Sequence, residues 1–326
     1  MSQSGLAEAV SAAPTQGLSS KPAGTHKARD LGHALPWVLP GLVLIFGVVL
    51  FPAGYMIYTS TRDISKVGVD RGGVGAGNFA TLFQVSDLPG VLLRTLIWVV
   101  TVVVGTMAIS LLLAHFLNKA FPGRTAVRLI LIIPWAASVL MTTIVVYYMF
   151  EPNYGLVNNL LMRLSQHFDF LSLFANGDYG FTKRMPAAFI LAIIVAIFVS
   201  LPFTTYTILA GYQSVPKDIV ESACVDGATP GQTFRQVTLP LLRPALMVAS
   251  IINIINVFNS YPILKVLTGS MPGFGADTTT TMMFKILQTN QLPGVAAALS
   301  VLNFGIVILV IAGYMWLVKP LKEVDA

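Results

Sequence analysis

The sequence predicts an all-α integral membrane protein with six transmembrane helices. Of its 326 residues, 55% are hydrophobic and only 10% are charged, whereas soluble domains carry about 25% charged residues. In addition, six stretches reach the roughly 20 predominantly apolar residues that a membrane-spanning helix needs. These stretches are approximately 35–58, 92–116, 127–150, 187–210, 245–267 and 295–318.

Residues 1–33 precede the first predicted span and are rich in Ser, Ala, Gly and Thr. Because they contain no apolar run, they cannot bury enough surface to order themselves, and we expect a disordered tail. The missing apolar core also argues against a signal peptide. The prediction is therefore a tail, 1–33, followed by one membrane domain, 34–326.

The net charge of +6 indicates orientation and not nucleic-acid binding, because Lys and Arg of membrane proteins gather in cytoplasmic loops. The short stretch 118–127 carries Lys119 and Arg124 without an acidic residue. We therefore place this stretch in the cytoplasm. An even number of spans then places both termini there, together with the polar stretch 212–244.

Motifs for catalysis are missing from the sequence. It contains no GxxxxGK[ST] nucleotide-binding loop, nucleophile elbow, carboxylate pair or metal-ligand spacing, so we predict neither an enzyme nor a cofactor held by this chain. The single cysteine, Cys224, excludes a disulfide within the chain, and we interpret it as a small structural residue.

Residues Tyr212–Pro244, hereafter the 212–244 segment, predict two short helices at an angle. Pro216 can open the first helix, and Gly227 suits a position after its end that requires a positive φ. Thr229 and Pro230 are typical of an N-cap and first helical residue, with Gln232 placed to complete a capping box. We expect Pro240 to end the second helix.

The same segment closely resembles the EAA loop of permease subunits in bacterial ABC importers, the part that docks onto the ATPase. The resemblance lies in Glu221-Ser222-Ala223, Asp226-Gly227-Ala228, Phe234, Val237, Leu239-Pro240 and Pro244. Ser222 replaces the second alanine of the motif, a change between small residues. The resemblance implies a type I ABC importer permease fold with cytoplasmic coupling helices. It assigns ATPase coupling to Glu221, Ala223, Asp226, Gly227, Ala228, Phe234, Pro240 and Pro244. Without this pattern, an amphipathic interfacial loop with solvated Glu221 and Asp226 would be the preferred interpretation.

Two further stretches are similar to the carbohydrate-uptake permeases of the maltose and glycerol-3-phosphate type. Leu267–Pro272 resembles their LTxGGP signature, with Met271 in place of a glycine, and Ala296–Ser300 opens the last span in a similar way. The resemblance implies a bacterial inner-membrane location and a sugar or related polyol as substrate. It also implies three kinds of protein partner: a second, unlike permease, two ATPase subunits that bind ATP and Mg²⁺, and an extracytoplasmic solute-binding protein.

Polar side chains recur on three predicted spans, where they are costly in lipid and usually face protein or a water-filled path. We predict a substrate path along them, because amides and hydroxyls bind uncharged sugars and an aromatic ring can stack on a sugar. The residues are Asn253, Asn256, Asn259 and Ser260 on the fifth span, Ser200 and Thr204 on the fourth, and Trp135 and Ser138 on the third. The alternative is that they join helices or bond to their own backbone.

Two other functions remain as alternatives at this stage. An ion-coupled secondary transporter usually holds an ionisable residue deep in a span, but the six predicted spans contain no Asp or Glu. A non-transporting membrane assembly subunit would share the docking loop, yet it would leave the polar residues of three spans without a role.

Overall fold

The computed structural model describes residues 36–151, 153–167, 185–269 and 273–318. The predicted tail 1–33 lies outside the described residues. The chain divides into two compact units, Met1–Tyr55 and Met56–Ala326, and each unit is described by itself.

In the first unit, Pro36–Tyr55 is helical and forms most of a 25-residue apolar helix, Pro36–Ser60. Ile45–Leu50 is π-helical, and α2 (Phe51–Ser60) follows it. The N–H of Phe51 donates to the carbonyl of Phe46, five residues earlier. This wider turn leaves room for the ring of Pro52, which an α-helix interior accommodates poorly.

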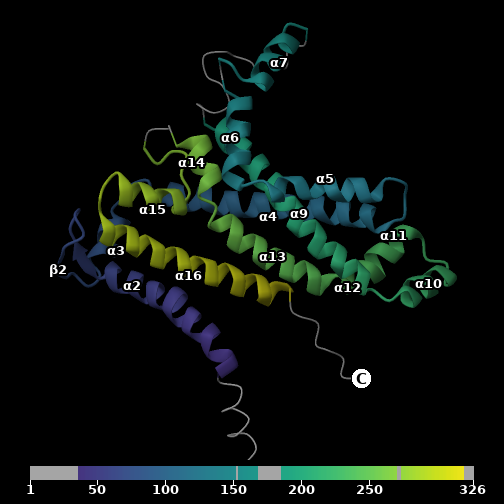
Figure 1. The fold of residues 1–326 in the computed structure, drawn as a ribbon, viewed down its shortest axis with the longest axis horizontal. Helices are drawn as coiled ribbons and strands as arrows, with labels where there is room; N and C mark the ends of the chain where they lie inside the picture. The colour runs from purple at the N-terminus through teal and green to yellow at the C-terminus, as the bar shows by residue number, and fades with distance from the viewer. Residues whose placement is uncertain (1–35, 152, 168–184, 270–272, 319–326) are drawn as a thin grey trace, which may run out of the picture. The chain divides into compact units, whose positions relative to one another are not determined.

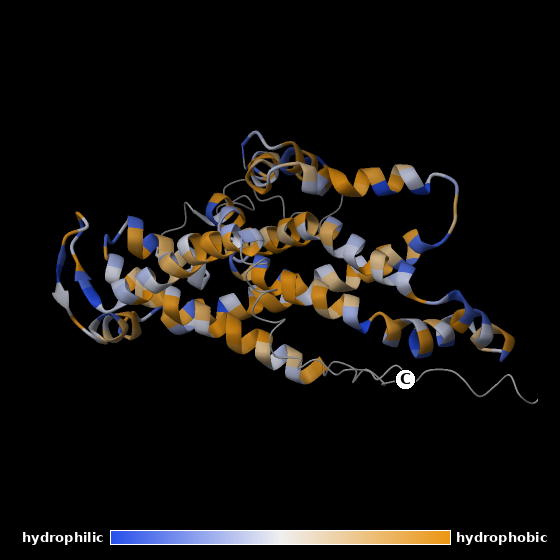
Figure 2. Cartoon of the chain, turned by 60° about the horizontal axis from the view of Figure 1, so that its bottom comes forward, coloured by the Kyte–Doolittle hydropathy of each residue, from blue (hydrophilic) through white to orange (hydrophobic). Residues whose placement is uncertain are grey.

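Four helices form the centre of the second unit (Figure 1): α4 (Leu88–Asn118), α9 (Ala187–Ser214), α13 (Arg243–Phe258) and α16 (Pro293–Val318). Helix α4 packs along α9, and α13 contacts α4, α9 and α16. Hydrophobic residues dominate all four, whereas hydrophilic residues gather toward the β1–β2 hairpin and toward α10 (Figure 2). Hydrophobic burial between these helices therefore forms the core that positions everything else.

Shorter elements lie around the four central helices. The helices are α3 (Gly77–Phe83), α5 (Arg124–Ala136), α6 (Val139–Met149), α7 (Leu156–Ser165), α10 (Lys217–Val225), α11 (Pro230–Gln232), α12 (Leu239–Leu241), α14 (Pro262–Thr268) and α15 (Thr279–Gln288). Strands β1 (Arg62–Ile64) and β2 (Asp70–Gly73) form an antiparallel hairpin. Arg62 donates to Asp70 across this hairpin, with 2.8 Å between Nε and Oδ2.

Among the described residues, four helices are long and apolar enough to cross a membrane, or up to six if two bent helix pairs each form one span. The predicted third span, 127–150, is not one straight helix. Helices α5 and α6 meet there at 93°, because Ala137 and Ser138 adopt extended backbone conformations just after Pro134. An extended pair of residues breaks the i→i−4 hydrogen bonds that would keep the helix continuous.

The predicted fifth span, 245–267, is also interrupted. Helix α13 ends at Phe258, and α14 begins at Pro262, whose missing N–H suits a first helical turn. Carbonyls in the last turn of α13 accept side-chain hydrogen bonds, two of them in addition to a backbone N–H of Asn259 or Ser260. Trp98 Nε1 donates to Val257 O, Thr280 Oγ1 to Phe258 O and Asn259 Nδ2 to Ile255 O, each at 2.9 Å. A helix can therefore stop inside an apolar layer without leaving these groups unsatisfied.

A polar network joins α15 to α4; we call it the α15 network. Lys285 Nζ lies 2.6 Å from Asp277 Oδ2, and the Asp277 side chain is 2% exposed. Arg94 on α4 donates to the carbonyls of Asp277 and Phe274 at 3.1 and 2.7 Å. The backbone N–H of Thr279 donates to Thr95 Oγ1 at 2.9 Å. The network therefore ties the start of α15 to the first turns of α4.

Candidate functional site

The first helix of the 212–244 segment ends in a Schellman motif. Helix α10 spans Lys217–Val225, one residue after the Pro216 that was expected to open it. Gly227 has φ +82°, a value that glycine adopts without a steric penalty. The N–H of Ala228 donates to Ala223 O at 3.0 Å and that of Gly227 to Cys224 O at 3.1 Å, which satisfies the last carbonyls of the helix. The predicted role of Gly227 in the backbone is confirmed.

The second helix begins at the predicted capping box. The N–H of Thr229 donates to Gln232 Oε1 at 2.8 Å, and the N–H of Gln232 donates to Thr229 Oγ1 at 3.4 Å. Pro230 occupies the first helical position, where its missing N–H removes no intrahelical hydrogen bond.

The prediction that Pro240 ends this helix is wrong, because the helix continues to Leu241. Thr233–Thr238 is π-helical, and the N–H of Leu239 donates to Phe234 O. The wider turn moves the carbonyl that the ring of Pro240 would otherwise contact. The chain then bends by 64° into α13.

Aromatic contacts attach the 212–244 segment to the helix bundle. The Phe234 ring meets the His115 ring edge-on, with centroids 5.1 Å apart. His115 Nδ1 lies 3.2 Å from the hydroxyl of Tyr212. Phe234 also packs against the buried cluster that includes Leu117 and Leu242. His115 was not among the predicted site residues, and the sequence gives no local signal for a contact between positions so far apart.

The predicted coupling residues divide into two sets by exposure. Glu221, Asp226, Gly227 and Pro244 are exposed, whereas Ala223, Ala228, Phe234 and Pro240 are half-buried. Two apolar side chains beside them were not predicted: Val225 is 87% exposed and Ile219 is 43% exposed. An acidic side chain next to exposed apolar ones on a rigid helix pair forms a surface suited to protein contact.

A cavity of about 670 Å³ lies between this segment and the ends of α4 and α9. Lys119, Arg124 and Lys217 line the cavity together with Glu221. The lysine and arginine that indicated orientation in the sequence therefore lie beside the polar segment.

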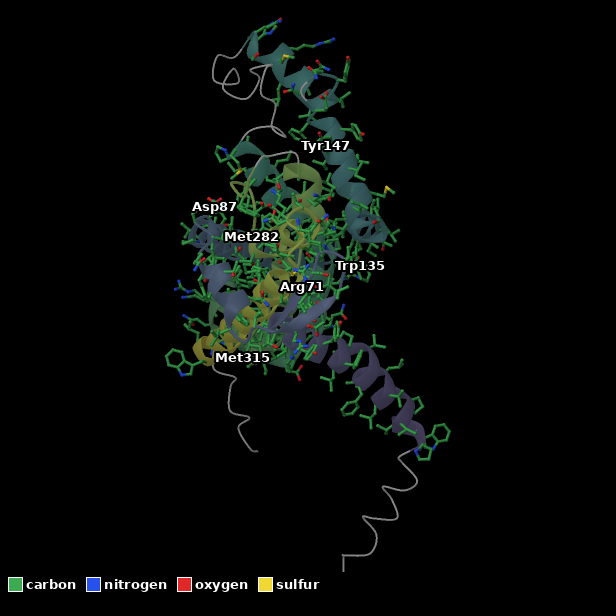
Figure 3. All side chains as sticks on the ribbon, turned by 90° about the vertical axis from the view of Figure 1, so that its left-hand side faces the viewer. Arg71, Asp87, Trp135, Tyr147, Met282 and Met315 are labelled. Atoms are coloured by element: carbon green, nitrogen blue, oxygen red, sulfur yellow. The ribbon has the colours of Figure 1, made fainter. Side chains whose placement is uncertain are left out.

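Six of the eight residues predicted for the substrate path line one cavity of about 500 Å³ among α5, α9 and the end of α13; we call it the polar cavity. They are Trp135, Ser200, Asn253, Asn256, Asn259 and Ser260. Trp135 is 62% exposed and lies at the margin of the helices, whereas Met282 lies inside the packed body (Figure 3). Residues from three predicted spans thus meet at one place.

The other two predicted residues do not line the polar cavity. Thr204 lies behind it and accepts a hydrogen bond from Asn253 Nδ2 at 2.6 Å, while its own hydroxyl donates to Ser200 O at 2.9 Å. Ser138 is exposed at the break between α5 and α6. Ser260 lies beyond the end of α13, so the backbone after the helix, and not helical spacing, places it beside Asn256.

The chemistry of the polar cavity is neutral. None of the described residues that line it is charged. Amides offer both donors and acceptors, hydroxyls offer both as well, and the Trp135 and Phe203 rings provide apolar faces. Such a lining suits an uncharged molecule with many hydroxyl groups.

Comparisons with known proteins place these features in context. Residues 106–315 match the family model described as "Binding-protein-dependent transport system inner membrane component". The chain is 33% identical to a probable ABC transporter permease protein of Brucella suis biovar 1, over 85% of this chain and 93% of the relative. It is 30% identical to the sulfoquinovosyl glycerol transport system permease protein SmoG of Agrobacterium fabrum, over 89% of this chain and 92% of the relative.

The fold is also similar to a solved structure. A chain in the crystal structure of a bacterial alginate ABC transporter, in complex with alginate pentasaccharide-bound periplasmic protein, superposes with a TM-score of 0.74. The two sequences are 21% identical, and the match covers 90% of this chain and 98% of the other.

Proposed function

The chain belongs to the family of binding-protein-dependent transport system inner membrane components, and from this premise we propose that it is the permease subunit of an ATP-driven sugar importer. The substrate is a sugar or related polyol, which crosses the membrane by alternating access through the polar cavity. The observation that carries this proposal is the convergence of six predicted polar and aromatic residues on one uncharged cavity.

The energy for transport comes from ATPase subunits that dock on the 212–244 segment. The sequence has no nucleotide-binding loop, so ATP and Mg²⁺ bind to those partners. Support for docking comes from the exposed set Glu221, Asp226 and Gly227, next to the exposed apolar Val225. Glu221 pairs there with a basic residue of the ATPase.

Movement passes from the 212–244 segment to the polar cavity through α13. The segment runs directly into α13, whose far end carries Asn253 and Asn256. At the near end α13 lies against α9: a Cβ added at Gly211 would come within 2.5 Å of Ala245 Cβ. A displacement of the segment therefore shifts α9 and α13, two of the helices that line the cavity, because packed helices move as rigid bodies.

The proposed assembly has both termini in the cytoplasm and contains a second, unlike permease, two ATPase subunits and a solute-binding protein that delivers the substrate. The similarity to a transporter crystallised with a periplasmic protein supports the last of these partners.

Uptake by the reconstituted complex tests the function. The complex is purified through a tag on this chain, placed in vesicles, and supplied with ATP inside and substrate with its binding protein outside. Asn256→Leu is expected to raise the KM of uptake about fivefold, because one hydrogen bond contributes about 1 kcal/mol. Ile255→Leu, which alters an exposed neighbour outside the cavity lining, is the matched control.

Asn253→Leu removes both a cavity amide and the bond to Thr204, so it is expected to lower uptake at least as much. Unchanged KM and kcat in both asparagine variants would instead assign these residues to helix packing. Uptake that proceeds without ATP, or a purified chain with no ATPase attached, would contradict the proposed function itself.

A further inference from the structure

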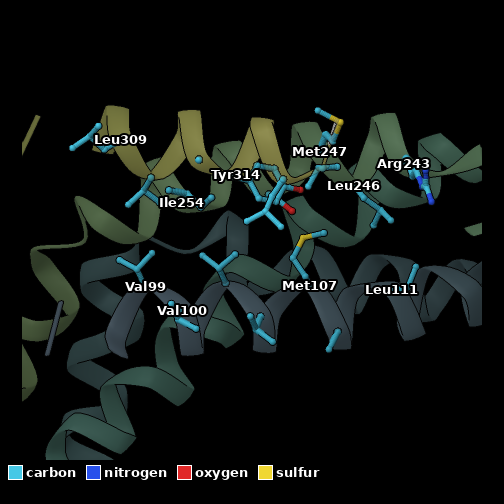
Figure 4. Close-up of a pocket in the computed structure, with 18 residues that line it drawn as sticks. Val99, Val100, Met107, Leu111, Arg243, Leu246, Met247, Ile254, Leu309 and Tyr314 are labelled. Carbon is cyan, nitrogen blue, oxygen red and sulfur yellow. The ribbon is translucent and has the colours of Figure 1, made fainter. Parts of the chain in front are cut away.

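A third cavity is lined in part by α13 but shares no lining residue with the polar cavity. It is a groove of about 800 Å³ between α4, α13 and α16; we call it the apolar groove. Its walls are aliphatic and methionine side chains, such as Val100, Met107, Leu246 and Leu309 (Figure 4). Leu309 is 72% exposed and Leu317, which also lines the groove, is 77% exposed. The groove therefore opens at the outer surface of the helix bundle.

One end of the apolar groove is charged. Arg243 lies at this end, on the side of Leu111 and away from Val99 and Leu309 (Figure 4). Among the described residues that line the groove, Arg243 carries the only charge. It is also the first residue of α13, where the positive end of the helix dipole lies. Both features attract an anion.

The length of the groove corresponds to one leaflet of a bilayer. Along α13 it runs from Arg243 to Ile254, eleven residue steps or about 16 Å at 1.5 Å per residue. The hydrocarbon core of a bilayer is about 30 Å thick, so the groove spans about half of it. An anion bound at Arg243 would then lie near headgroup depth, with the apolar walls extending toward the bilayer centre.

We propose that the apolar groove binds an anionic phospholipid, with one acyl chain along α4, α13 and α16 and its phosphate paired with Arg243. Basic residues at the ends of grooves between transmembrane helices bind lipid headgroups in this way. In the orientation given under Proposed function, the lipid comes from the cytoplasmic leaflet. The groove, its charge and its length do not depend on what the protein transports.

The structure offers a variant that fills the groove without a clash. Gly313 lines the groove, and a Cβ added there meets no atom within 4 Å. Gly313→Leu therefore places a side chain in the space assigned to the acyl chain. Gly305 on the same helix is equally open but does not line the groove, so Gly305→Leu is the matched control. For the charge, Arg243→Gln is paired with Arg235→Gln, an exposed arginine outside the groove.

The experiment measures lipid bound to the purified full-length chain by native mass spectrometry, after addition of phosphatidylglycerol or phosphatidylcholine. The wild type is expected to prefer phosphatidylglycerol. Arg243→Gln is expected to weaken binding of phosphatidylglycerol about fivefold, the effect of one basic residue at a membrane surface, and to leave phosphatidylcholine unchanged. Gly313→Leu is expected to weaken both lipids, while both control variants behave as the wild type.

Three results would overturn the proposal. The first is equal binding of the two lipids by the wild type, and the second is unchanged phosphatidylglycerol binding in Arg243→Gln. The third is occupation of the groove by a protein helix. A Gly313→Cys variant in a Cys224→Ser background tests this occupant, because cross-linking from position 313 to another helix in the assembled complex would exclude the lipid. None of these results bears on ATP-driven uptake, which is measured separately.

Discussion

The α15 network and the 212–244 segment differ in where their polar groups find partners. In the α15 network, the buried carboxylate of Asp277 pairs with Lys285 of the same chain. In the 212–244 segment, Glu221 and Asp226 are exposed, and Phe234 provides much of the attachment to the bundle. The polar groups of the first region pair within the chain, whereas the second leaves these two carboxylates exposed, and we propose that these contact a partner. We therefore expect substitutions in the first to change stability and those in the second to change coupling.

The largest loss of stability is expected from Lys285→Met. Removal of one partner of a buried ion pair leaves the other charge uncompensated, which costs about 3–5 kcal/mol. Thermal unfolding of the purified chain, followed by tryptophan fluorescence, measures the change. Lys265→Met alters an exposed lysine and is expected to unfold as the wild type does. Equal unfolding of the two variants would show that the pair does not stabilise the network.

A smaller loss, about 2 kcal/mol, is expected from Phe234→Ala, because the ring is half-buried and a fully buried Phe→Ala change costs about 3–5 kcal/mol. The same unfolding measurement applies. Val225→Ala removes an apolar side chain that is 87% exposed and is the control. A Phe234→Ala variant as stable as the control would mean that the segment is attached elsewhere.

Glu221→Lys is expected to leave the free energy of unfolding within about 0.5 kcal/mol of the wild type, as surface substitutions do. Its effect should fall on ATPase binding, which we expect to weaken about thirtyfold or more, because truncating one partner of a buried charge pair costs at least 2 kcal/mol. Co-purification of the ATPase and ATP-driven uptake measure this effect. Asp218→Lys makes the same charge change at an exposed position of α10. Wild-type uptake by Glu221→Lys would contradict docking through this residue.

The smallest effect on stability is expected from protonation of Asp70, which pairs with Arg62 in the β1–β2 hairpin. The Arg62 guanidinium, with the N–H of Gly72, lowers the pKa of Asp70 below its usual value. A carboxyl whose pKa is lowered by folding stabilises the folded state above its unfolded pKa, about 3.9, and that stabilisation is lost as the pH falls through the lower, folded value. The amide signal of Gly72 in an NMR titration should therefore change below about pH 3.9, and not at all in Asp70→Asn. A midpoint at or above that pH would contradict the pairing.

Local signals in the sequence predicted the parts of the structure that local hydrogen bonds determine. Gly227, Thr229 and Gln232 act on backbone groups within five residues, so their roles could be predicted from the sequence alone. The helix break at Ala137 and the helical position of Pro240 depend on packing and on a shifted hydrogen-bond register, which composition does not reveal.

Contacts between distant positions were beyond prediction from the sequence. Trp98 donates to a carbonyl 159 positions away, and Arg94 to one 183 positions away. The polar residues of three spans were identified individually, but their meeting at one cavity depends on the packing of α5, α9 and α13. What that cavity binds stays a prediction.

The end of α13 at Phe258 makes Trp98, Thr280 and Asn259 more than packing residues. Each donates a side-chain hydrogen bond to a carbonyl in the last turn of this helix; Trp98 comes from α4, Thr280 from α15, and Asn259 directly follows α13. Side-chain hydrogen bonds therefore fix this end of the helix, whereas the other end, joined to the 212–244 segment, packs against α9 at Gly211. At position 98 the indole N–H matters as much as the ring: a phenylalanine would fill much of the space but would remove the side-chain donor to Val257 O.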